Sequence, residues 1–260
     1  MDIQSLIDTV NTDLLKKITQ TIVAMDSQNP PGKTAPIASY LATVCKELGF
    51  ETRICLMDND RHNIVAYFGE GERDVILSGH LDTVPAGDLA LWTYPPLEAT
   101  EVEGKLFGRG TADMKGGVAS LIVAMDILRR SGLKFTHRIV FVGTADEEVG
   151  MKGAFHLAKA GVMSKADALI ITEATALRVG IAEKGPYWVR IVVRGKAAHG
   201  SMPHLGKNAI EGACIAIQKL QELLPQIVHP LLGSSTLNIG LIQGGTKINV
   251  VPAECYFDCD

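Results

Sequence analysis

Apolar residues recur every three to four positions near the start of the chain, and this period predicts amphipathic helices. A first helix is expected over Ile3–Ile22, with the Asn-Pro-Pro-Gly turn at Asn29–Gly32 as the break that follows it. A second helix is expected over Ile37–Leu48, with Gly49 as its stop. The chain therefore opens with two helices that each present one apolar face to a core.

Further along the chain, short apolar runs typical of strands alternate with longer runs of helical period. The strand-like runs are Glu51–Leu56, Asn63–Phe68, Asp74–Leu77, Arg138–Gly143 and Ala168–Thr172, and the helical runs are Met114–Arg130 and Ala154–Ala160. Strands that alternate with helices favour a sheet covered by helices on both faces. The prediction is a three-layer α/β domain with a mostly parallel sheet.

The pattern changes after about residue 180, where strand-like runs surround a single helical run. In chain order the runs are Tyr187–Val193, Ala209–Leu224, Thr236–Leu241 and Ile248–Phe257. This β-α-β-β order predicts a smaller α+β unit, and it divides the chain into domains 1–179 and 180–260. The sequence stops directly after the last strand-like run, so we expect the second domain to be incomplete and the sequence to be part of a longer protein.

The 260 residues are 47% hydrophobic and 21% charged, with a formal net charge of −4, which is typical of a globular protein. Only 5% are aromatic and no Lys/Arg cluster occurs, so we expect no nucleic-acid partner. No window approaches the roughly 18 consecutive apolar residues of a membrane helix, and the start lacks a signal-peptide pattern. We therefore expect no membrane partner. Five scattered cysteines favour reduced thiols and a cytoplasmic location.

Acidic and imidazole side chains follow the ends of three predicted strands. His80 and Asp82 come after the strand at Asp74–Leu77, Glu147 and Glu148 come after the buried run at 138–143, and Glu173 lies one residue past the end of the run at 168–172. Open α/β sheets place their ligands at the carboxyl ends of strands. A neutral imidazole is a good metal ligand, and a nearby carboxylate can fix its tautomer.

Asp113 lies in a glycine-rich stretch, Gly108–Gly117, at the start of the long predicted helix. Taken alone, Asp113 is equally well explained as a residue that caps the helix. The other acids, each taken alone, are equally well explained as parts of solvated loops. Taken together, one histidine and several carboxylates at successive junctions of one sheet favour a two-metal hydrolytic site.

Several stretches of the sequence resemble the motifs of a known family. The stretches SGHLDTVPAGD, LFGRGTADMKGG, TADEEVG, ITEAT, GKAAHGSMPHLGKNAI and GGTKINVVP are similar to motifs of the M20 family of metallopeptidases and deacylases. That family includes acetylornithine deacetylase, succinyl-diaminopimelate desuccinylase and carboxypeptidase G. The resemblance runs from about residue 10 to the end of the chain. It implies a zinc-peptidase-like catalytic domain and an inserted ferredoxin-like lid and dimerisation domain.

The resemblance implies roles for the acidic and imidazole residues. His80 and Glu173 would bind one metal ion and Glu148 a second, while Asp113 would bridge the two. The peptide bond from Asp113 to the next residue, Met114, would be cis. Asp82 would orient His80. In this family, a glutamate at the position of Glu173 accompanies deacylases.

Further roles follow from the same resemblance. Glu147 would be the general base, which takes a proton from the attacking water and passes it to the leaving nitrogen. His199 would reach the active site of a partner subunit and stabilise the oxyanion. Asn249, Gly244 and Gly245 fall where the family contacts substrate or closes its lid.

The implied cofactor is zinc, two ions per complete site, with cobalt or manganese as other candidates. The family takes a histidine for the second metal from a C-terminal segment, and His204 and His229 lie in the wrong unit to supply it. We therefore expect a complete first metal site and an incomplete second one, which leaves the activity of these 260 residues open.

The leading hypothesis is a metal-dependent hydrolase that cleaves the amide bond of an N-acyl amino acid and forms a homodimer through the lid. The alternatives are a dipeptidase or carboxypeptidase of the same family, acting on a short peptide, and a non-catalytic metal-binding or dimerisation fragment. No Gly-x-Ser-x-Gly stretch indicates a serine hydrolase, and no phosphate-binding loop indicates a nucleotide site.

Overall fold

In the computed structural model, which describes residues 3–225 and 227–260, the chain divides into two compact units, Met1–Arg178 and Val179–Asp260. The division falls one residue before the predicted domain boundary. The assignment of a catalytic role to the first unit and a lid role to the second stays a prediction. None of the described helices is both long and apolar enough to cross a membrane.

The first unit begins with two helices where the sequence analysis expected one. They are α1 (Ile3–Ile7) and α2 (Thr12–Ala24). The prediction of one helix was wrong because the side chain of Asn11 accepts a hydrogen bond of 2.9 Å from the backbone N–H of Leu14. That bond caps a new helix, which side-chain acceptors at this position favour.

The remaining helices of the first unit lie close to their predicted positions. They are α3 (Ala35–Glu47), α4 (Lys115–Arg130) and α5 (Lys152–Lys159). Gly49 adopts a positive φ of 83° just after α3. That left-handed conformation suits glycine and marks a helix end.

A five-stranded sheet forms the centre of the first unit, in the order β1-β2-β6-β3-β7. Its strands are β1 (Glu51–Leu56), β2 (His62–Phe68), β3 (Asp74–His80), β6 (Arg138–Thr144) and β7 (Ala166–Ile171). The pairs β6–β3 and β3–β7 are parallel, whereas β1–β2 and β2–β6 are antiparallel. The predicted mostly parallel sheet is therefore wrong in detail. Residues 57–61 join β1 directly to β2 and leave no room for the crossover that a parallel pair needs.

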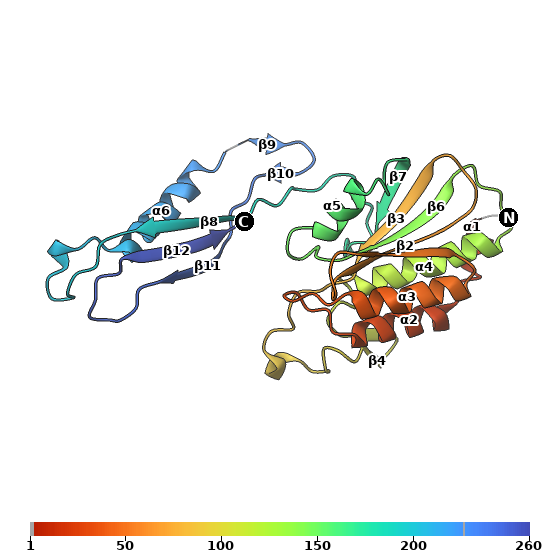
Figure 1. The fold of residues 1–260 in the computed structure, drawn as a ribbon, viewed down its shortest axis with the longest axis horizontal. Coiled ribbons are helices and arrows are strands. Elements are labelled where there is room, and N and C mark those ends of the chain that lie inside the picture. Colours follow the sequence, from red (N-terminus) through yellow and green to blue (C-terminus); the bar gives the residue numbers. More distant parts are fainter. Residues whose placement is uncertain (1–2, 226) are drawn as a thin grey trace. The chain divides into compact units, whose positions relative to one another are not determined.

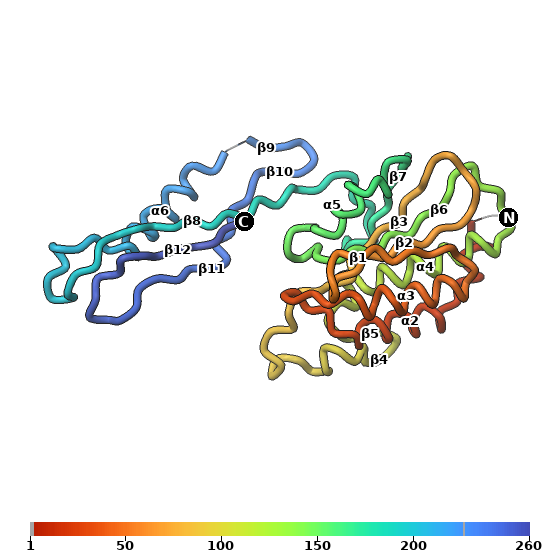
Figure 2. The backbone as a smooth tube through the Cα atoms, viewed as in Figure 1, coloured from red at the N-terminus to blue at the C-terminus, as the bar shows by residue number. Residues whose placement is uncertain are grey.

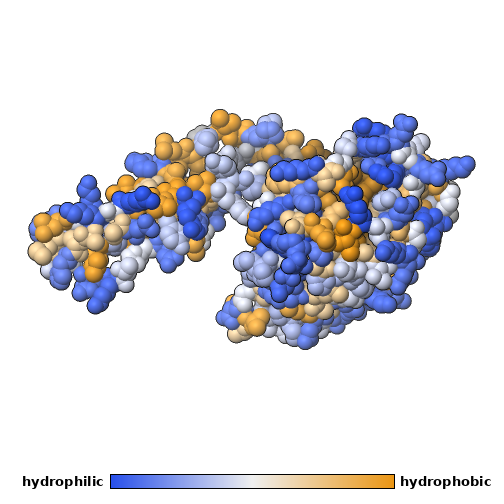
Figure 3. All heavy atoms as spheres, viewed as in Figure 1, coloured by the Kyte–Doolittle hydropathy of each residue, from blue (hydrophilic) through white to orange (hydrophobic). Residues whose placement is uncertain are grey.

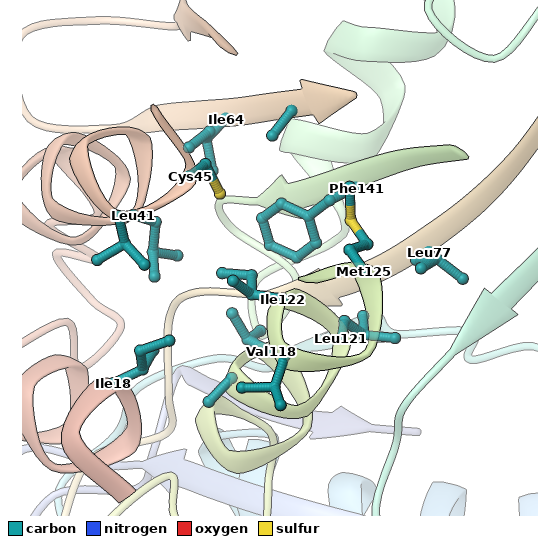
Figure 4. Packing of buried hydrophobic residues seen from close by; sticks show 14 of the residues in the cluster. Ile18, Leu41, Cys45, Ile64, Leu77, Val118, Leu121, Ile122, Met125 and Phe141 are labelled. Carbon is teal, nitrogen blue, oxygen red and sulfur yellow. The ribbon is translucent and has the colours of Figure 1, made fainter. Parts of the chain in front are cut away.

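Helices cover both faces of this sheet, as the three-layer prediction required (Figure 1). The larger core lies between the sheet and the helices α2, α3 and α4, and Figure 4 shows Ile18, Leu41, Ile122 and Phe141 converging there. A smaller core beneath α5 is built around Val65, Ile76, Val140, Val142 and Leu157. Each fully buried aliphatic side chain contributes about 1.5–3 kcal/mol relative to an exposed one, so these two cores fix the sheet on both sides.

A short hairpin that the sequence analysis missed precedes α4. Its strands are β4 (Thr100–Val102) and β5 (Lys105–Phe107), joined by Glu103 and Gly104 with φ of 51° and 75°. Two consecutive positive φ values define the tight turn that suits a two-residue hairpin. The hairpin lies beside α2 (Figure 2), where the side chain of Gln20 donates to the carbonyl of Ala99 at 3.4 Å.

The second unit contains a three-stranded antiparallel sheet, in the order β11-β12-β8, with one helix packed on it. Its main elements are β8 (Val189–Arg194), α6 (Ala209–Leu223), β11 (Ile239–Gly244) and β12 (Glu254–Cys259), and the short ones are β9 (Val228–His229) and β10 (Gly233–Ser234). The β-α-β-β order is as predicted. Both of the last two strands begin later than expected, and residues 245–253 form the loop between them.

The core of the second unit is small. Ala209 and Ala213 of α6 pack against Cys255 and Phe257 of β12. The surface of this unit mixes apolar and charged side chains (Figure 3), and the apolar ones include Trp188, Val192, Leu241 and Ile242.

Candidate metal centre

The predicted metal ligands of the first unit meet at the carboxyl ends of the parallel strands. His80 ends β3, the turn at 145–148 follows β6, and Glu173 lies two residues beyond β7. The Nε2 atom of His80 lies 3.1 Å from Oδ1 of Asp113 and 3.9 Å from Oε1 of Glu173. Residues from three strands and from the start of α4 therefore converge on one point.

One triad in this cluster has the spacing of a metal site. His80, Asp113 and Glu148 each offer a ligand atom, and these atoms lie within 4.8 Å of one another. The imidazole is buried, whereas the side chain of Asp113 is 61% exposed. One imidazole with carboxylates is a donor set that suits zinc, manganese or cobalt, so the residues present fit a divalent cation.

The orientation of His80 depends on Asp82, but mainly through its backbone. Nδ1 of His80 lies 2.9 Å from the carbonyl oxygen of Asp82, while the nearest carboxylate oxygen is 3.8 Å away. Because a carbonyl only accepts, the proton of a neutral imidazole belongs on Nδ1, which leaves the lone pair of Nε2 directed at the acidic cluster.

The Asp82 carboxylate instead holds the backbone of the two glutamates that follow β6. This fully buried group accepts hydrogen bonds from the N–H groups of Glu147 at 3.1 Å and Glu148 at 3.3 Å. A carboxylate oxygen of Glu148 in turn accepts a hydrogen bond of 3.2 Å from the N–H of Val84. Asp82 therefore links the position of His80 to that of both glutamates.

Three residues behind this arrangement were missed by the sequence analysis. The side-chain amide of Asn29 donates to Asp82 at 2.8 Å and to Asp146 at 3.0 Å. The guanidinium of Arg61 donates to the other oxygen of Asp146 at 2.8 Å. Asp146 is fully buried with a φ of 58°, a conformation that aspartate tolerates better than most residues. The sequence pointed to these three residues only through the position of Asp146 beside Glu147 and Glu148.

The start of α4 comes unusually close to the end of β7. A side-chain carbon at Gly117 would lie 2.5 Å from the backbone oxygen of Thr172, so only glycine fits there. The buried ammonium of Lys115 donates to the carbonyls of Ile22 at 2.8 Å and Met25 at 2.9 Å, at the end of α2. These contacts bring Asp113 next to Glu173. The peptide bond from Asp113 to Met114 is cis, as the family resemblance implied.

The electrostatics of the cluster favour a bound cation. Burial raises the pKa of the Glu173 carboxyl, and the neighbouring charges of Asp113 and Glu147 raise it further, against a lowering effect of His80. Burial likewise raises the pKa of Glu148, with the same two acids adding to it. The pKa of His80 is raised as well, although its burial opposes this, because the surrounding carboxylates favour its charged form. A divalent cation would offset this crowding of negative charge.

The two site residues predicted in the second unit lie side by side. The N–H of Gly200, next to His199, donates to the carbonyl of Asn249 at 2.8 Å, and His199 forms a backbone bridge with Val250. Nδ1 of His199 lies 2.8 Å from the hydroxyl of Ser201. Both predicted residues are exposed.

Comparison with known proteins matches this chain to one family. The sequence model of the family described as Peptidase family M20/M25/M40 matches residues 76–251. A probable succinyl-diaminopimelate desuccinylase from Staphylococcus epidermidis is 40% identical over 175 residues, which cover 67% of this chain and 43% of the relative. An acetylornithine deacetylase from Vibrio campbellii is 37% identical over 232 residues, which cover 87% of this chain and 60% of the relative. The chain thus spans about half the length of these relatives.

Solved structures share the fold. A tripeptidase from Staphylococcus aureus gives a TM-score of 0.68 at 22% identity, over 96% of this chain and 66% of that one. A metallo-carboxypeptidase from Sulfolobus solfataricus gives a TM-score of 0.70 at 16% identity, over 94% of this chain and 70% of that one. Both confirm the predicted fold class.

Proposed function

The chain belongs to peptidase family M20/M25/M40, and on that basis we propose that it is the metal-binding part of a hydrolase that cleaves the amide bond of an N-acyl amino acid. The observation that carries the proposal is the convergence of His80, Asp113 and Glu148, whose ligand atoms lie within 4.8 Å of one another. Relatives named as a desuccinylase and a deacetylase support the deacylase reading.

His80, Asp113, Glu148 and Glu173 would hold the metal ions, with zinc as the first candidate and cobalt or manganese as others. A bound divalent ion supplies a Lewis acid that polarises the amide carbonyl and lowers the pKa of water. The protein contributes the geometry. His80 is held by the carbonyl of Asp82, the carboxylate of Glu148 accepts a hydrogen bond from the N–H of Val84, and the N–H of Glu148 donates to the carboxylate of Asp82. A carboxylate oxygen of Asp113 lies 3.1 Å from Nε2 of His80, and a ligand atom of Asp113 lies within 4.8 Å of one of Glu148, in keeping with a bridging role.

Glu147 is proposed as the general base. Its backbone N–H donates to Asp82 at 3.1 Å, and its charge raises the pKa of both Glu148 and Glu173, so its carboxylate belongs to the same cluster. It would take a proton from the attacking water and deliver it to the nitrogen of the leaving amine. A base placed in this way contributes about 10²–10⁴-fold to the rate.

His199 and Asn249 are proposed to contact the substrate, with His199 acting across a homodimer of the second unit. Their neighbouring positions in one loop pair support a shared role. The homodimer, the N-acyl amino acid substrate and the cytoplasmic location stay predictions.

The test is hydrolysis of N-acyl amino acids by the metal-loaded protein, compared with its Glu147→Gln variant. We expect the variant to bind metal normally and to lose about 10²–10⁴-fold in kcat. Cleavage of dipeptides in preference to N-acyl amino acids would favour the dipeptidase alternative. Metal binding without any hydrolysis by the complete protein would favour the non-catalytic alternative, and an unchanged kcat in Glu147→Gln would remove Glu147 as the base.

A further inference from the structure

One buried ion pair lies behind the metal cluster. The carboxylate of Asp146 is fully buried, and it accepts hydrogen bonds from the amide of Asn29 at 3.0 Å and from the guanidinium of Arg61 at 2.8 Å. Because the amide is neutral, Arg61 supplies the positive charge that a carboxylate removed from water requires. The pair therefore ties the segment before β2 to the turn after β6, which lie 85 residues apart in sequence.

Arg61 is itself held from the opposite side. Its Nε donates to the carboxylate of Asp58 at 2.7 Å, and a second guanidinium nitrogen contacts the same oxygen. The other oxygen of Asp58 accepts a hydrogen bond of 2.9 Å from the backbone N–H of Arg61. The side chain of Arg61 is 33% exposed, and a guanidinium is not deprotonated in proteins. Arg61 is thus a permanent cation whose donors are divided between the surface and the interior.

The place of Asp146 in the chain decides what this ion pair can influence. Asp146 comes directly before Glu147 and Glu148, and its backbone has a φ of 58°. Its partner Asn29 donates a second hydrogen bond, of 2.8 Å, to Asp82, and the same carboxylate accepts hydrogen bonds from the N–H groups of both glutamates. Two routes, one covalent and one through hydrogen bonds, therefore lead from Asp146 to the glutamates.

Loss of the positive charge at Arg61 would leave Asp146 as a buried carboxylate without a cation. Such a charge is strongly unfavourable once its partner is removed, and the carboxylate would lower this cost by moving toward water. Because Glu148 is two residues further along, that movement would shift its backbone. The carboxylate of Glu148 now offers a ligand atom within 4.8 Å of those of His80 and Asp113, and the shift would take it out of this arrangement.

We propose that Arg61 is a positioning residue for the metal centre. Through Asp146 it fixes the turn at 145–148, and this keeps the carboxylate of Glu148 within reach of a cation bound at the cluster. Residues that hold metal ligands in place from behind typically contribute about 10–100-fold to metal affinity. The inference rests on the proposed function in taking Glu148 as a ligand, and its test does not depend on hydrolysis.

The test measures the affinity of the metal-free protein for Co²⁺, whose visible spectrum changes with the ligands that surround it. Arg61→Met removes the charge and keeps a long side chain, whereas Arg61→Lys keeps the charge. Arg53→Met makes the same change at an exposed arginine and is the matched control. Each affinity is measured well below the unfolding midpoint of the variant, so that a loss of stability alone does not change the result.

We expect Arg61→Met to weaken cobalt binding by about 10–100-fold and to change the visible spectrum. Arg61→Lys should retain part of the affinity, and Arg53→Met should match the original protein. When Asp146→Asn is added to Arg61→Met, the unpaired buried charge disappears, so part of the lost affinity should return. A folded Arg61→Met protein with the cobalt affinity and spectrum of the Arg53→Met control would overturn the proposal.

Glu148→Gln distinguishes this inference from the proposed function. If Arg61 acts through Glu148, adding Arg61→Met to Glu148→Gln should weaken cobalt binding no further, because the effects of residues in one network of contacts are not additive. Further weakening would overturn the inference and leave Glu148 as a ligand. An unchanged affinity in Glu148→Gln alone would overturn both. Cobalt binding that depends on Arg61 and Glu148, in a protein that hydrolyses no amide, would support the inference and overturn the proposed reaction.

Discussion

The side-chain amide of Asn29 donates a hydrogen bond of 3.0 Å to the buried carboxylate of Asp146, although 117 residues separate the two in sequence. The same amide donates its second hydrogen to Asp82. One small polar group therefore satisfies two buried charges, and each of those charges lies next to residues proposed to bind metal or move protons. This arrangement gives the first prediction.

Asn29→Ala should weaken both the fold and the metal centre. Two buried carboxylates would each lose a donor, and a hydrogen bond to a charged group is worth about 1.5–3 kcal/mol. We expect the free energy of unfolding of the metal-free protein to fall by at least that amount in denaturant titrations. Zinc affinity should fall as well, because Asp82 holds the backbone of Glu147 and Glu148. Lys33→Ala, an exposed change four residues along, is the control. A stability loss no larger than that of the control would contradict this account.

His80→Ala should abolish tight metal binding. The imidazole contributes the single nitrogen ligand of the triad, and its Nε2 faces Asp113 and Glu173. Elemental analysis of protein dialysed against buffered zinc should give at least one ion per chain in the original protein. The variant should give none. His156→Ala changes an exposed histidine on α5 and should retain the original stoichiometry. If His80→Ala kept its zinc, this cluster would not be the metal centre.

Gly117→Ala should destabilise the protein even though alanine is the better helix former. In an open helix this change would stabilise by about 0.5–1 kcal/mol. Here the added carbon would lie 2.5 Å from the carbonyl oxygen of Thr172, and overpacking of this kind costs about 1–3 kcal/mol. Thermal unfolding of Gly117→Ala should therefore show a lower midpoint. Gly185→Ala, at a position with open space around it, should leave the midpoint close to its original value, and a higher midpoint for Gly117→Ala would refute the close approach of α4 and β7.

Cys45 should make stability fall at alkaline pH. Burial raises the pKa of its thiol to about 12, from an ordinary value of 9.0. Above pH 9 the unfolded chain loses a proton that the folded chain keeps, so unfolding becomes easier as pH rises toward 12. The slope contributed by this thiol approaches about 1.4 kcal/mol per pH unit.

The measurement is the free energy of unfolding between pH 8.5 and about 10.5, for the original protein and for Cys45→Ala. The variant should lose this component of the slope, whatever its overall stability. Cys214→Ala, which removes an exposed thiol, should keep the slope. Parallel pH profiles for the original protein and Cys45→Ala would mean that the Cys45 thiol ionises freely in the folded state.

The sequence allowed the ligand cluster to be predicted because its members follow a simple positional rule. His80, Glu148 and Glu173 each lie at or within four residues of the carboxyl end of a strand, and parallel strands end at the same edge of a sheet. The family was confirmed by a match over residues 76–251, which include these residues, and the fold class by similarity to solved structures. The roles of these residues stay predictions.

The supporting residues could not be predicted in this way. Asn29 and Arg61 reach Asp146 from segments 117 and 85 residues away, and no local period encodes such a pairing. The direction of β2 was missed although the sequence held a local signal for it, since residues 57–61 are too few for the crossover that a parallel pair needs. The hairpin at 100–107 was missed because its strands have three residues each, too few to show an alternation.

The buried tie from Lys115 to the end of α2 joins parts of the chain that are 93 and 90 residues apart. A growing polypeptide on the ribosome therefore makes α2 long before the lysine that fastens it emerges. Glu173 emerges later still. Until α4 has emerged, α2 and α3 have only part of the surface they pack against. Until Glu173 has emerged, the acids that follow β3 and β6 lack this neighbour. Contacts that close such long loops form late and slowly. Metal binding at the proposed centre should therefore follow synthesis of nearly all of the first unit, because a nascent chain that ends before Glu173 lacks one of the proposed ligands.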